Sequence, residues 1–99
     1  MQTQRQIQQF TEVLGEELVL NTMSKLAQIE GAKCLRRIER LQSELAQYED
    51  RFTLKSEEAW KQYQSGKLGD DFDVMEWMGL FENLRALQAY YTRLTNIQN

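Results

Sequence analysis

The chain has 99 residues, of which 41% are hydrophobic and 27% are charged, and its formal net charge is −3. This composition is typical of one small globular domain and is too apolar for a disordered chain. The sequence has no histidine and a single cysteine, Cys34, which excludes an imidazole zinc site, a Ser-His-Asp triad and an internal disulfide.

The first residues are rich in glutamine and do not have the basic start and apolar stretch of a signal peptide. No apolar run approaches the roughly 18–20 residues that a membrane span needs. Together with the lone cysteine, these features predict a cytoplasmic protein that is not bound to a membrane. Because so short a chain buries little of its surface, we also expect it to form a homo-oligomer.

The N-terminal segment is expected to begin with a polar tail over residues 1–9. Ile7, Phe10 and Leu14 have the spacing of one helix face. The apolar pattern that continues from them predicts helix over about residues 10–52. The sequence has no proline, which favours long uninterrupted helices.

Two glycines leave the number of helices in this segment open. Gly15 and Gly31 each weaken a helix by roughly 1 kcal/mol relative to alanine. Either glycine could bend or break the segment, so it is expected to form one long helix or two helices. A short strand over residues 17–20 is an alternative, because so short an apolar run does not distinguish the period of a helix from that of a strand.

The clearest helical pattern lies in the middle of the chain. Apolar residues alternate spacings of three and four over two heptads, at Ile38, Leu41, Leu45, Tyr48 and Phe52. Two heptads are too few for a sustained coiled coil. We therefore expect a helix that packs lengthwise against its neighbours.

A basic cluster accompanies this helix, formed by Lys33, Arg36, Arg37 and Arg40. Glutamates lie between and around these residues, which favours a solvated helix face over a nucleic-acid contact. A binder of duplex DNA would need a stronger cationic surface than a chain of net charge −3 offers.

A short helix is expected over residues 56–65. Thr53 and Ser56 are both residue types that cap helix N-termini, so the chain is predicted to break at residues 53–55 and to restart at Ser56. Gly66 suits the left-handed position that ends a helix.

The next residues carry a set of helix-start signals for a C-terminal helix over residues 73–96. With Asp73 as the N-cap, Glu76 occupies the third helical position and completes an acidic form of the capping box. Phe72 before the cap and Trp77 after it would form a hydrophobic staple.

The same acidic residues could be taken for a metal or catalytic site. Asp70, Asp71, Asp73 and Glu76 do not have the spacing of a calcium loop. The neighbouring glycines lack the spacing of a phosphate-binding loop. Because helix capping explains Asp73 and Glu76 fully, we assign no catalytic residue, metal ligand or cofactor.

The C-terminal helix is apolar on more than one side. One broad face must be core and comprises Trp77, Leu80, Phe81, Leu84, Leu87, Tyr91 and Leu94. A second face, with small residues and methionines that suit an adaptable contact, is the predicted partner-binding surface. Its residues are Met75, Met78, Gly79, Glu82, Ala86, Ala89 and Tyr90. Alternatively, the N-terminal segment folds back and covers this face.

Half of the chain resembles a group of small prokaryotic proteins. The residues that carry the resemblance are LAQYEDRF (45–52), KSEEAW (55–60), YQSGKLGDD (63–71) and the pair Glu76 and Trp77, before a leucine-rich helix. Some of these proteins are proposed antitoxins encoded beside a small ribonuclease-like toxin. The resemblance implies a non-catalytic partner that neutralises a cognate toxin and needs no cofactor.

The sequence as a whole predicts an all-α protein, a long helical hairpin or a small helical bundle that dimerises. We expect a non-enzymatic protein–protein interaction module, with an antitoxin as the specific role that the resemblance implies. The alternative is a homodimeric helical adaptor with a structural or regulatory role.

Overall fold

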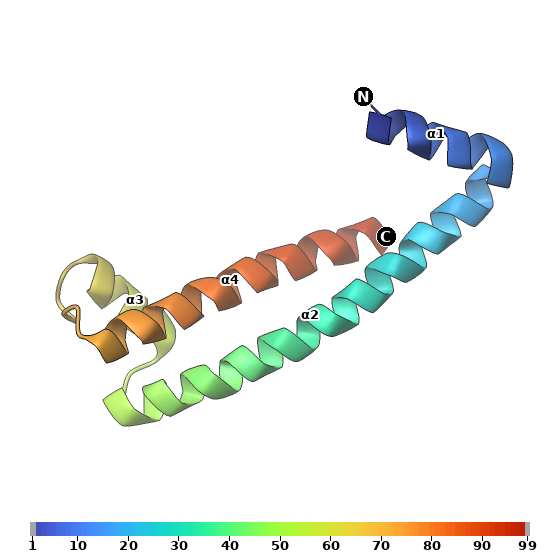
Figure 1. The fold of residues 1–99 in the computed structure, drawn as a ribbon. Coiled ribbons are helices and arrows are strands. Elements are labelled where there is room, and N and C mark those ends of the chain that lie inside the picture. Colours follow the sequence, from blue (N-terminus) through green and yellow to red (C-terminus); the bar gives the residue numbers. More distant parts are fainter. Residues whose placement is uncertain (1, 99) are drawn as a thin grey trace.

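A computed structural model describes residues 2–98, and within them the chain forms four helices and no strand (Figure 1). The helices are α1 (Gln2–Leu14), α2 (Glu16–Phe52), α3 (Ser56–Gln64) and α4 (Phe72–Gln98). The prediction of an all-α fold is therefore confirmed. The molecule is elongated, with extents of 58 × 26 × 20 Å and a radius of gyration of 19.5 Å. A compact domain of this length would have a radius of gyration of about 13 Å.

The central unit is an antiparallel hairpin of α2 and α4, with α3 packed beside the first turns of α4 (Figure 1). Its core is formed by the apolar stripe of α2 and the apolar face of α4. The buried residues at its centre are Cys34, Ile38, Leu45, Ala59, Val74, Trp77, Met78, Phe81 and Leu84. The heptad pattern thus predicts the face of α2 that meets α4.

The N-terminal segment differs from the expectation of a polar tail followed by one helix or two. The tail predicted over residues 1–9 is wrong, because α1 already begins at Gln2; Met1 lies outside the described residues. The alternative of a strand over residues 17–20 is also wrong, because these residues belong to α2. Gly15 separates α1 from α2 and has a φ of +93°, which side chains strongly disfavour. Gly31, by contrast, lies inside α2 without a break.

A tight turn connects α2 to α3. Thr53 adopts a left-handed conformation with φ of 51° at the end of α2, and its backbone N–H donates to the carbonyl of Glu49. The backbone N–H of Leu54 donates to the same carbonyl at 3.1 Å. The N-cap of α3 is Lys55, so Ser56 is the first helical residue rather than the cap.

Trp77 joins the three elements at the end of the hairpin where α3 lies, which we call the closed end. Its side chain is fully buried. Its ring stacks on Phe52 at a centroid distance of 5.0 Å and on Tyr48 at 6.0 Å, both from α2. Its indole N–H donates a hydrogen bond of 3.0 Å to the hydroxyl of Ser56 in α3. Aromatic stacking and a satisfied buried donor fix how the three helices meet.

The capping arrangement predicted for α4 is wrong in its register. The helix begins at Phe72, and the N–H of Met75 bonds to the carbonyl of Asp71 at 2.9 Å, so Asp71 holds the cap position. Asp73 lies inside the first turn and forms an ion pair with Arg51. Phe72 is 78% exposed, so it forms no staple with the buried Trp77.

We expect Ser56→Ala to lower the free energy of unfolding by about 1–3 kcal/mol, because it leaves the buried indole N–H of Trp77 without an acceptor. Urea unfolding followed by tryptophan fluorescence measures the effect. The matched control is Ser65→Ala, whose hydroxyl bonds to the Gln62 carbonyl at the surface, and which should change stability by less than about 0.5 kcal/mol. Equal losses in the two variants would contradict the role of Ser56.

We expect Gly31→Ala to raise the free energy of unfolding by about 0.5–1 kcal/mol, since alanine favours the helix interior. A Cβ at Gly31 would meet Cε1 of Tyr91 at 3.6 Å, which is ordinary van der Waals contact. The reciprocal control is Ala32→Gly at the exposed neighbouring position, which should be destabilising by a similar amount in the same urea titration. A loss of stability in Gly31→Ala would mean that α2 and α4 approach more closely than described.

Candidate functional site

The residues predicted to bind a partner from α4 lie mostly on one exposed side of that helix. Six of the seven are exposed: Met75, Gly79, Glu82, Ala86, Ala89 and Tyr90. We call this set the outer face of α4. It holds two large exposed hydrophobic side chains, Met75 at 54% and Tyr90 at 41%. The alternative covering by the N-terminal segment does not occur, because these six residues are exposed and α1 packs against α2 at the far end of the hairpin (Figure 1).

Met78 does not belong to this surface. Its side chain is only 2% exposed and lies in the hydrophobic core. The reason is α3, which packs against the first turns of α4 and brings Ala59 and Trp60 to that side of the helix. The sequence pattern of α4 alone does not reveal this third neighbour.

The largest exposed apolar surface lies elsewhere, on α1 and the first half of α2. Of the fifteen exposed large hydrophobic side chains among the described residues, nine lie between residues 7 and 29, and they are 39–82% exposed. These are Ile7, Phe10, Val13, Leu14, Leu18, Leu20, Met23, Leu26 and Ile29. We call residues 2–30 the N-terminal arm.

The arm is exposed because the two long helices differ in length. At 1.5 Å per residue, the 37 residues of α2 span about 55 Å and the 27 residues of α4 span about 40 Å. The closed end aligns Phe52 with Trp77, and the far end of α4 brings Tyr91 to Gly31. The residues of α2 before this point extend beyond most of α4 (Figure 1).

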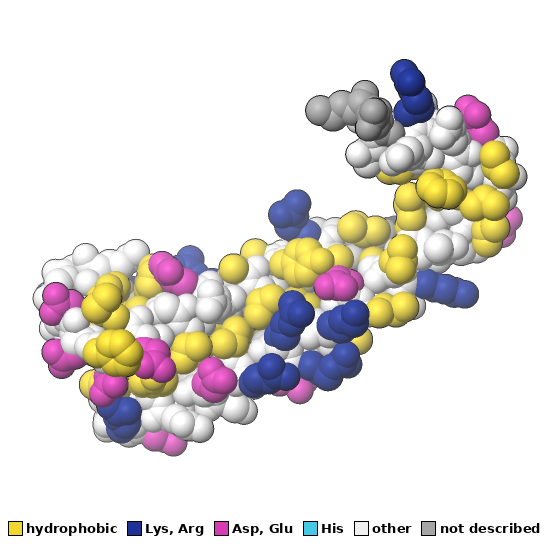
Figure 2. Space-filling model, viewed as in Figure 1, with side chains coloured by type: hydrophobic (Ala, Val, Ile, Leu, Met, Phe, Trp, Pro, Cys, Tyr) yellow, Lys and Arg dark blue, Asp and Glu magenta, His cyan; other side chains and the backbone are white. Residues whose placement is uncertain are grey.

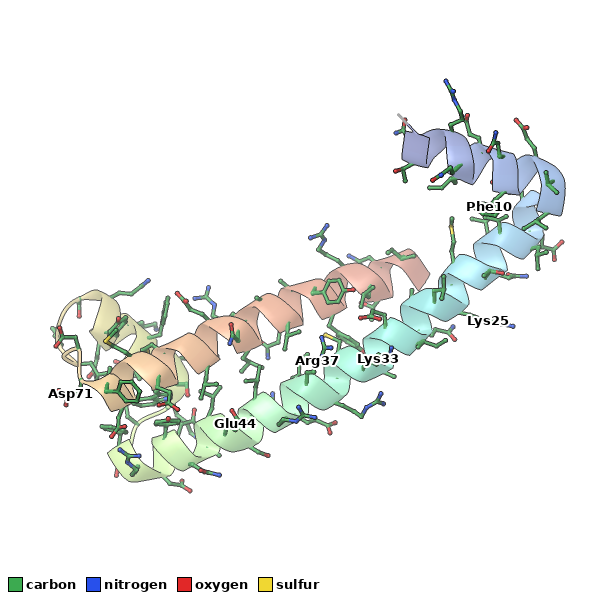
Figure 3. The ribbon with its side chains drawn as sticks, in the orientation of Figure 1. Phe10, Lys25, Lys33, Arg37, Glu44 and Asp71 are labelled. Carbon is green, nitrogen blue, oxygen red and sulfur yellow. The ribbon has the colours of Figure 1, made fainter. Side chains whose placement is uncertain are left out.

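A hollow lies on α1, beside the elbow at Gly15 where α1 meets α2. A shallow pocket of about 450 Å³ is lined by Gln6, Gln9, Phe10, Val13 and Leu14 of α1. Phe10 lies at this elbow, where α1 meets the first turns of α2 (Figure 3). Phe10 is nevertheless 60% exposed, so α1 and α2 cover each other only in part.

The basic cluster lies immediately beyond the arm on α2. Lys33, Arg36, Arg37 and Arg40 are all exposed, and Lys33 and Arg37 lie on the middle of the helix (Figure 3). Figure 2 shows Lys and Arg side chains gathered over the middle of the molecule, beside the hydrophobic side chains of the arm. Within residues 2–98 the one ion pair is that of Arg51 with Asp73. The four side chains of the cluster are therefore exposed and form no ion pair within the described part of the chain.

A second hollow lies between α2, α3 and α4. This groove has a volume of about 740 Å³, and its walls include Leu45, Trp60, Phe81 and Arg85. The Arg85 guanidinium lies 5.8 Å from the centre of the Trp60 ring, in cation–π geometry. Because acidic and basic residues both line the groove, it favours no ligand of one charge.

The remaining groups that could carry chemistry are the carboxylates and the one thiol. Among residues 2–98, no group of three or more Cys, Asp or Glu side chains could hold a metal ion. Asp70 and Asp71 are exposed in the loop before α4. Cys34 is buried, and its thiol donates to the Leu87 carbonyl at 3.4 Å, which makes it a core residue rather than an accessible nucleophile.

Comparisons with protein-family models, curated proteins and solved structures find no match to this chain. Among the described residues, no helix is both long enough and apolar enough to cross a lipid bilayer. The candidate site is therefore inferred from the exposure and chemistry of its side chains alone. The sequence pattern had predicted the outer face of α4 but not the arm. The available signal was that residues 18–29 are apolar on more than one side of the helix.

Glu76, predicted as a capping residue, lies near Tyr48 at the closed end. Burial raises the pKa of the Tyr48 phenol above its ordinary value of 10.0, and the charge of Glu76 raises this pKa further. The folded state thus favours the neutral phenol. This stabilisation is fully present below the unfolded pKa of about 10 and is lost as the pH rises through the folded value.

We therefore expect Tyr48 to ionise above pH 10.0 in the folded chain. The measurement is the tyrosinate absorbance of the wild type minus that of Tyr48→Phe during an alkaline titration. Glu76→Gln should move this difference curve to lower pH, because it removes a nearby negative charge. A difference curve centred at or below 10.0 would contradict the assignment.

Proposed function

We propose that this protein is a non-catalytic protein–protein interaction module whose main binding surface is the N-terminal arm. The observation that supports this proposal is the set of nine large hydrophobic side chains that are exposed on the arm. Contiguous apolar surfaces on small proteins mark sites of interaction. A helical face of this kind is suited to another helix or a hydrophobic groove.

The exposed area supports this function. A compact monomer of 11.8 kDa exposes about 5,900 Å², whereas this chain exposes 7765 Å². The excess of about 1,900 Å² is larger than the roughly 800 Å² that each partner buries in a standard interface. A partner that covers the arm would remove much of this excess from water, at about 25 cal/mol per Å² of apolar area.

The outer face of α4 is a second and smaller candidate surface. Its small residues, Gly79 and Ala86, let a partner approach the helix closely, as the sequence pattern predicts. Its exposed apolar side chains are fewer than those of the arm. We therefore assign the main interaction to the arm and a supporting contact to α4.

The specific role of an antitoxin comes from the resemblance over residues 45–94 and stays a prediction. That resemblance spans the closed end and most of α4, whereas the arm lies outside it. In such a protein, the hairpin would be the shared scaffold and the arm the segment that differs in its choice of partner. A cytoplasmic location is part of the same proposal.

Site-specific photo-crosslinking in the native cells tests the function. A benzophenone amino acid at Leu26, which is 61% exposed on the arm, should form discrete adducts with protein, because a bound partner lies within reach. The matched control places the same group at the exposed Gln28, which is on the polar side of the same helix. A third position, Met75, reports on the outer face of α4.

The masses of the adducts give the outcome. Discrete adducts at Leu26 that are absent at Gln28 would support the arm as the binding surface. If Leu26 gave no more adduct than Gln28, the proposed surface would be wrong. Adducts at Met75 alone would move the function to the outer face of α4.

A further inference from the structure

One face of α2 carries positive charges and no negative one between residues 18 and 40. At 100° per residue, the residues within about 80° of one another on this face are Leu18, Thr22, Lys25, Ile29, Lys33, Arg36 and Arg40. We call these seven residues the cationic face of α2. All seven are exposed, so the face is open along about 33 Å of the helix.

The core side of α2 lies on the other side of the helix. Cys34, Ile38 and Leu45 pack in the hydrophobic core, about 160° around the helix from the centre of the cationic face. The hairpin therefore leaves the cationic face uncovered. Lys25 and Lys33 follow one another along α2 in Figure 3, and Figure 2 shows the Lys and Arg side chains gathered over the middle of the molecule.

The glutamates that accompany these cations in the sequence lie on other sides of the helix. Glu30 and Glu44 lie beyond one edge of the cationic face, and Glu39 lies beyond the other. Among residues 2–98, none of the four cations of the face forms an ion pair. The face thus gathers four positive charges on a chain whose net charge is −3.

Two aliphatic side chains share the face with the cations. Leu18 is 52% exposed and Ile29 is 56% exposed, and Ile29 lies between Lys25 and Lys33 along the helix. A surface that matches this face must offer negative charge and apolar groups side by side. The surface of an anionic phospholipid bilayer offers both, because its headgroups attract lysine and arginine and its acyl chains accept aliphatic side chains.

We infer that the cationic face of α2 binds the surface of an anionic phospholipid bilayer, with α2 lying along the surface and α4 on the side away from it. This inference goes beyond the proposed function, because the occupant is a lipid surface and not a protein. Leu20, Met23 and Leu26 lie outside the cationic face, towards the core side of α2. They therefore stay available to the protein partner of the arm.

The shape of the face favours a bilayer over a nucleic acid. Because its residues follow one side of a single helix, a flat surface can contact all of them at once. A nucleic-acid backbone offers phosphates to the cations but no apolar contact for Leu18 and Ile29. Neither of the two hollows described above is lined by a residue of this face, which fits contact with a flat surface.

The sequence alone predicted no membrane association, because it has no apolar span. Binding to a bilayer surface needs no span and depends on cations and exposed apolar side chains together. The cationic face is defined only once the side of α2 that packs on α4 is known. Each Lys or Arg near an anionic surface strengthens binding by about fivefold.

Co-sedimentation of the full chain with lipid vesicles tests the inference. Vesicles of equal parts phosphatidylcholine and phosphatidylglycerol should bind the chain at least about tenfold more tightly than vesicles of phosphatidylcholine alone. Added salt should weaken this binding, because it screens exposed charges. Equal binding to both kinds of vesicle, or no binding to either, would overturn the inference.

Removing cations tests which face makes the contact. Arg36→Gln/Arg40→Gln should weaken binding to the anionic vesicles by at least about tenfold. The matched control is Lys61→Gln/Lys67→Gln, which makes the same change in net charge at exposed positions of α3 and the following loop and should leave binding within about twofold. Equal losses would mean that net charge alone drives binding. Circular dichroism checks that the helices of each variant are intact.

Removing an aliphatic side chain separates a bilayer from other anionic partners. Ile29→Gln should weaken vesicle binding by at least about threefold. The control is Leu35→Gln, at a position that is 40% exposed on another side of α2 and should show no loss. Unchanged binding in Ile29→Gln would overturn the contact with acyl chains. Binding to single-stranded polyuridylate as tight as that to the anionic vesicles would assign the face to a nucleic acid instead.

Failure of this inference is distinguishable from failure of the proposed function. Photo-adducts at Leu26 report on the protein partner, whereas vesicle binding reports on the lipid. Protein adducts at Leu26 without vesicle binding would overturn the lipid contact alone. Protein adducts from a benzophenone group placed at Ile29, again without vesicle binding, would assign the cationic face to an acidic protein.

Discussion

The arrangement of the molecule depends on the burial of Trp77. This one side chain contacts α2 through Phe52 and Tyr48 and contacts α3 through Ser56. A fully buried indole loses its hydration, so its N–H must have an acceptor. Ser56, at the start of α3, supplies that acceptor. Its backbone N–H donates a hydrogen bond of 2.8 Å to the Glu49 carboxylate, which holds the start of α3 against α2. The register between α2 and α4 is thereby set at one end.

The exposure of the arm follows from this register. Because the hairpin is aligned at its closed end, the whole difference in length between α2 and α4 appears at the other end. Residues that would be core in a longer hairpin, such as Leu20 and Met23, are instead exposed. Gly15 then directs α1 away from the axis of α2, so α1 does not replace the missing part of α4 (Figure 1).

The periodic spacing of apolar residues predicted the contacts between a helix and its immediate neighbour. The stripe from Ile38 to Phe52 and the core face of α4 meet as their spacing indicates. The errors concern contacts with a third element. Trp77 is core, as its helix face predicts, but it packs on α2 and α3 and not on Phe72. Met78 was expected to face a partner, and it is buried because α3 packs there, a position that no local pattern encodes. The exposure of the arm likewise depends on where α4 ends relative to α2.

The two halves of α2 contribute differently to the stability of the hairpin. The second half of α2 holds the hairpin together through Ile38, Leu45 and Tyr48. The first half contributes few buried side chains, so polar substitutions there remove little core packing. The cluster around Trp77 therefore determines whether the hairpin forms, and the exposed side chains of the first half of α2 can change without loss of that cluster.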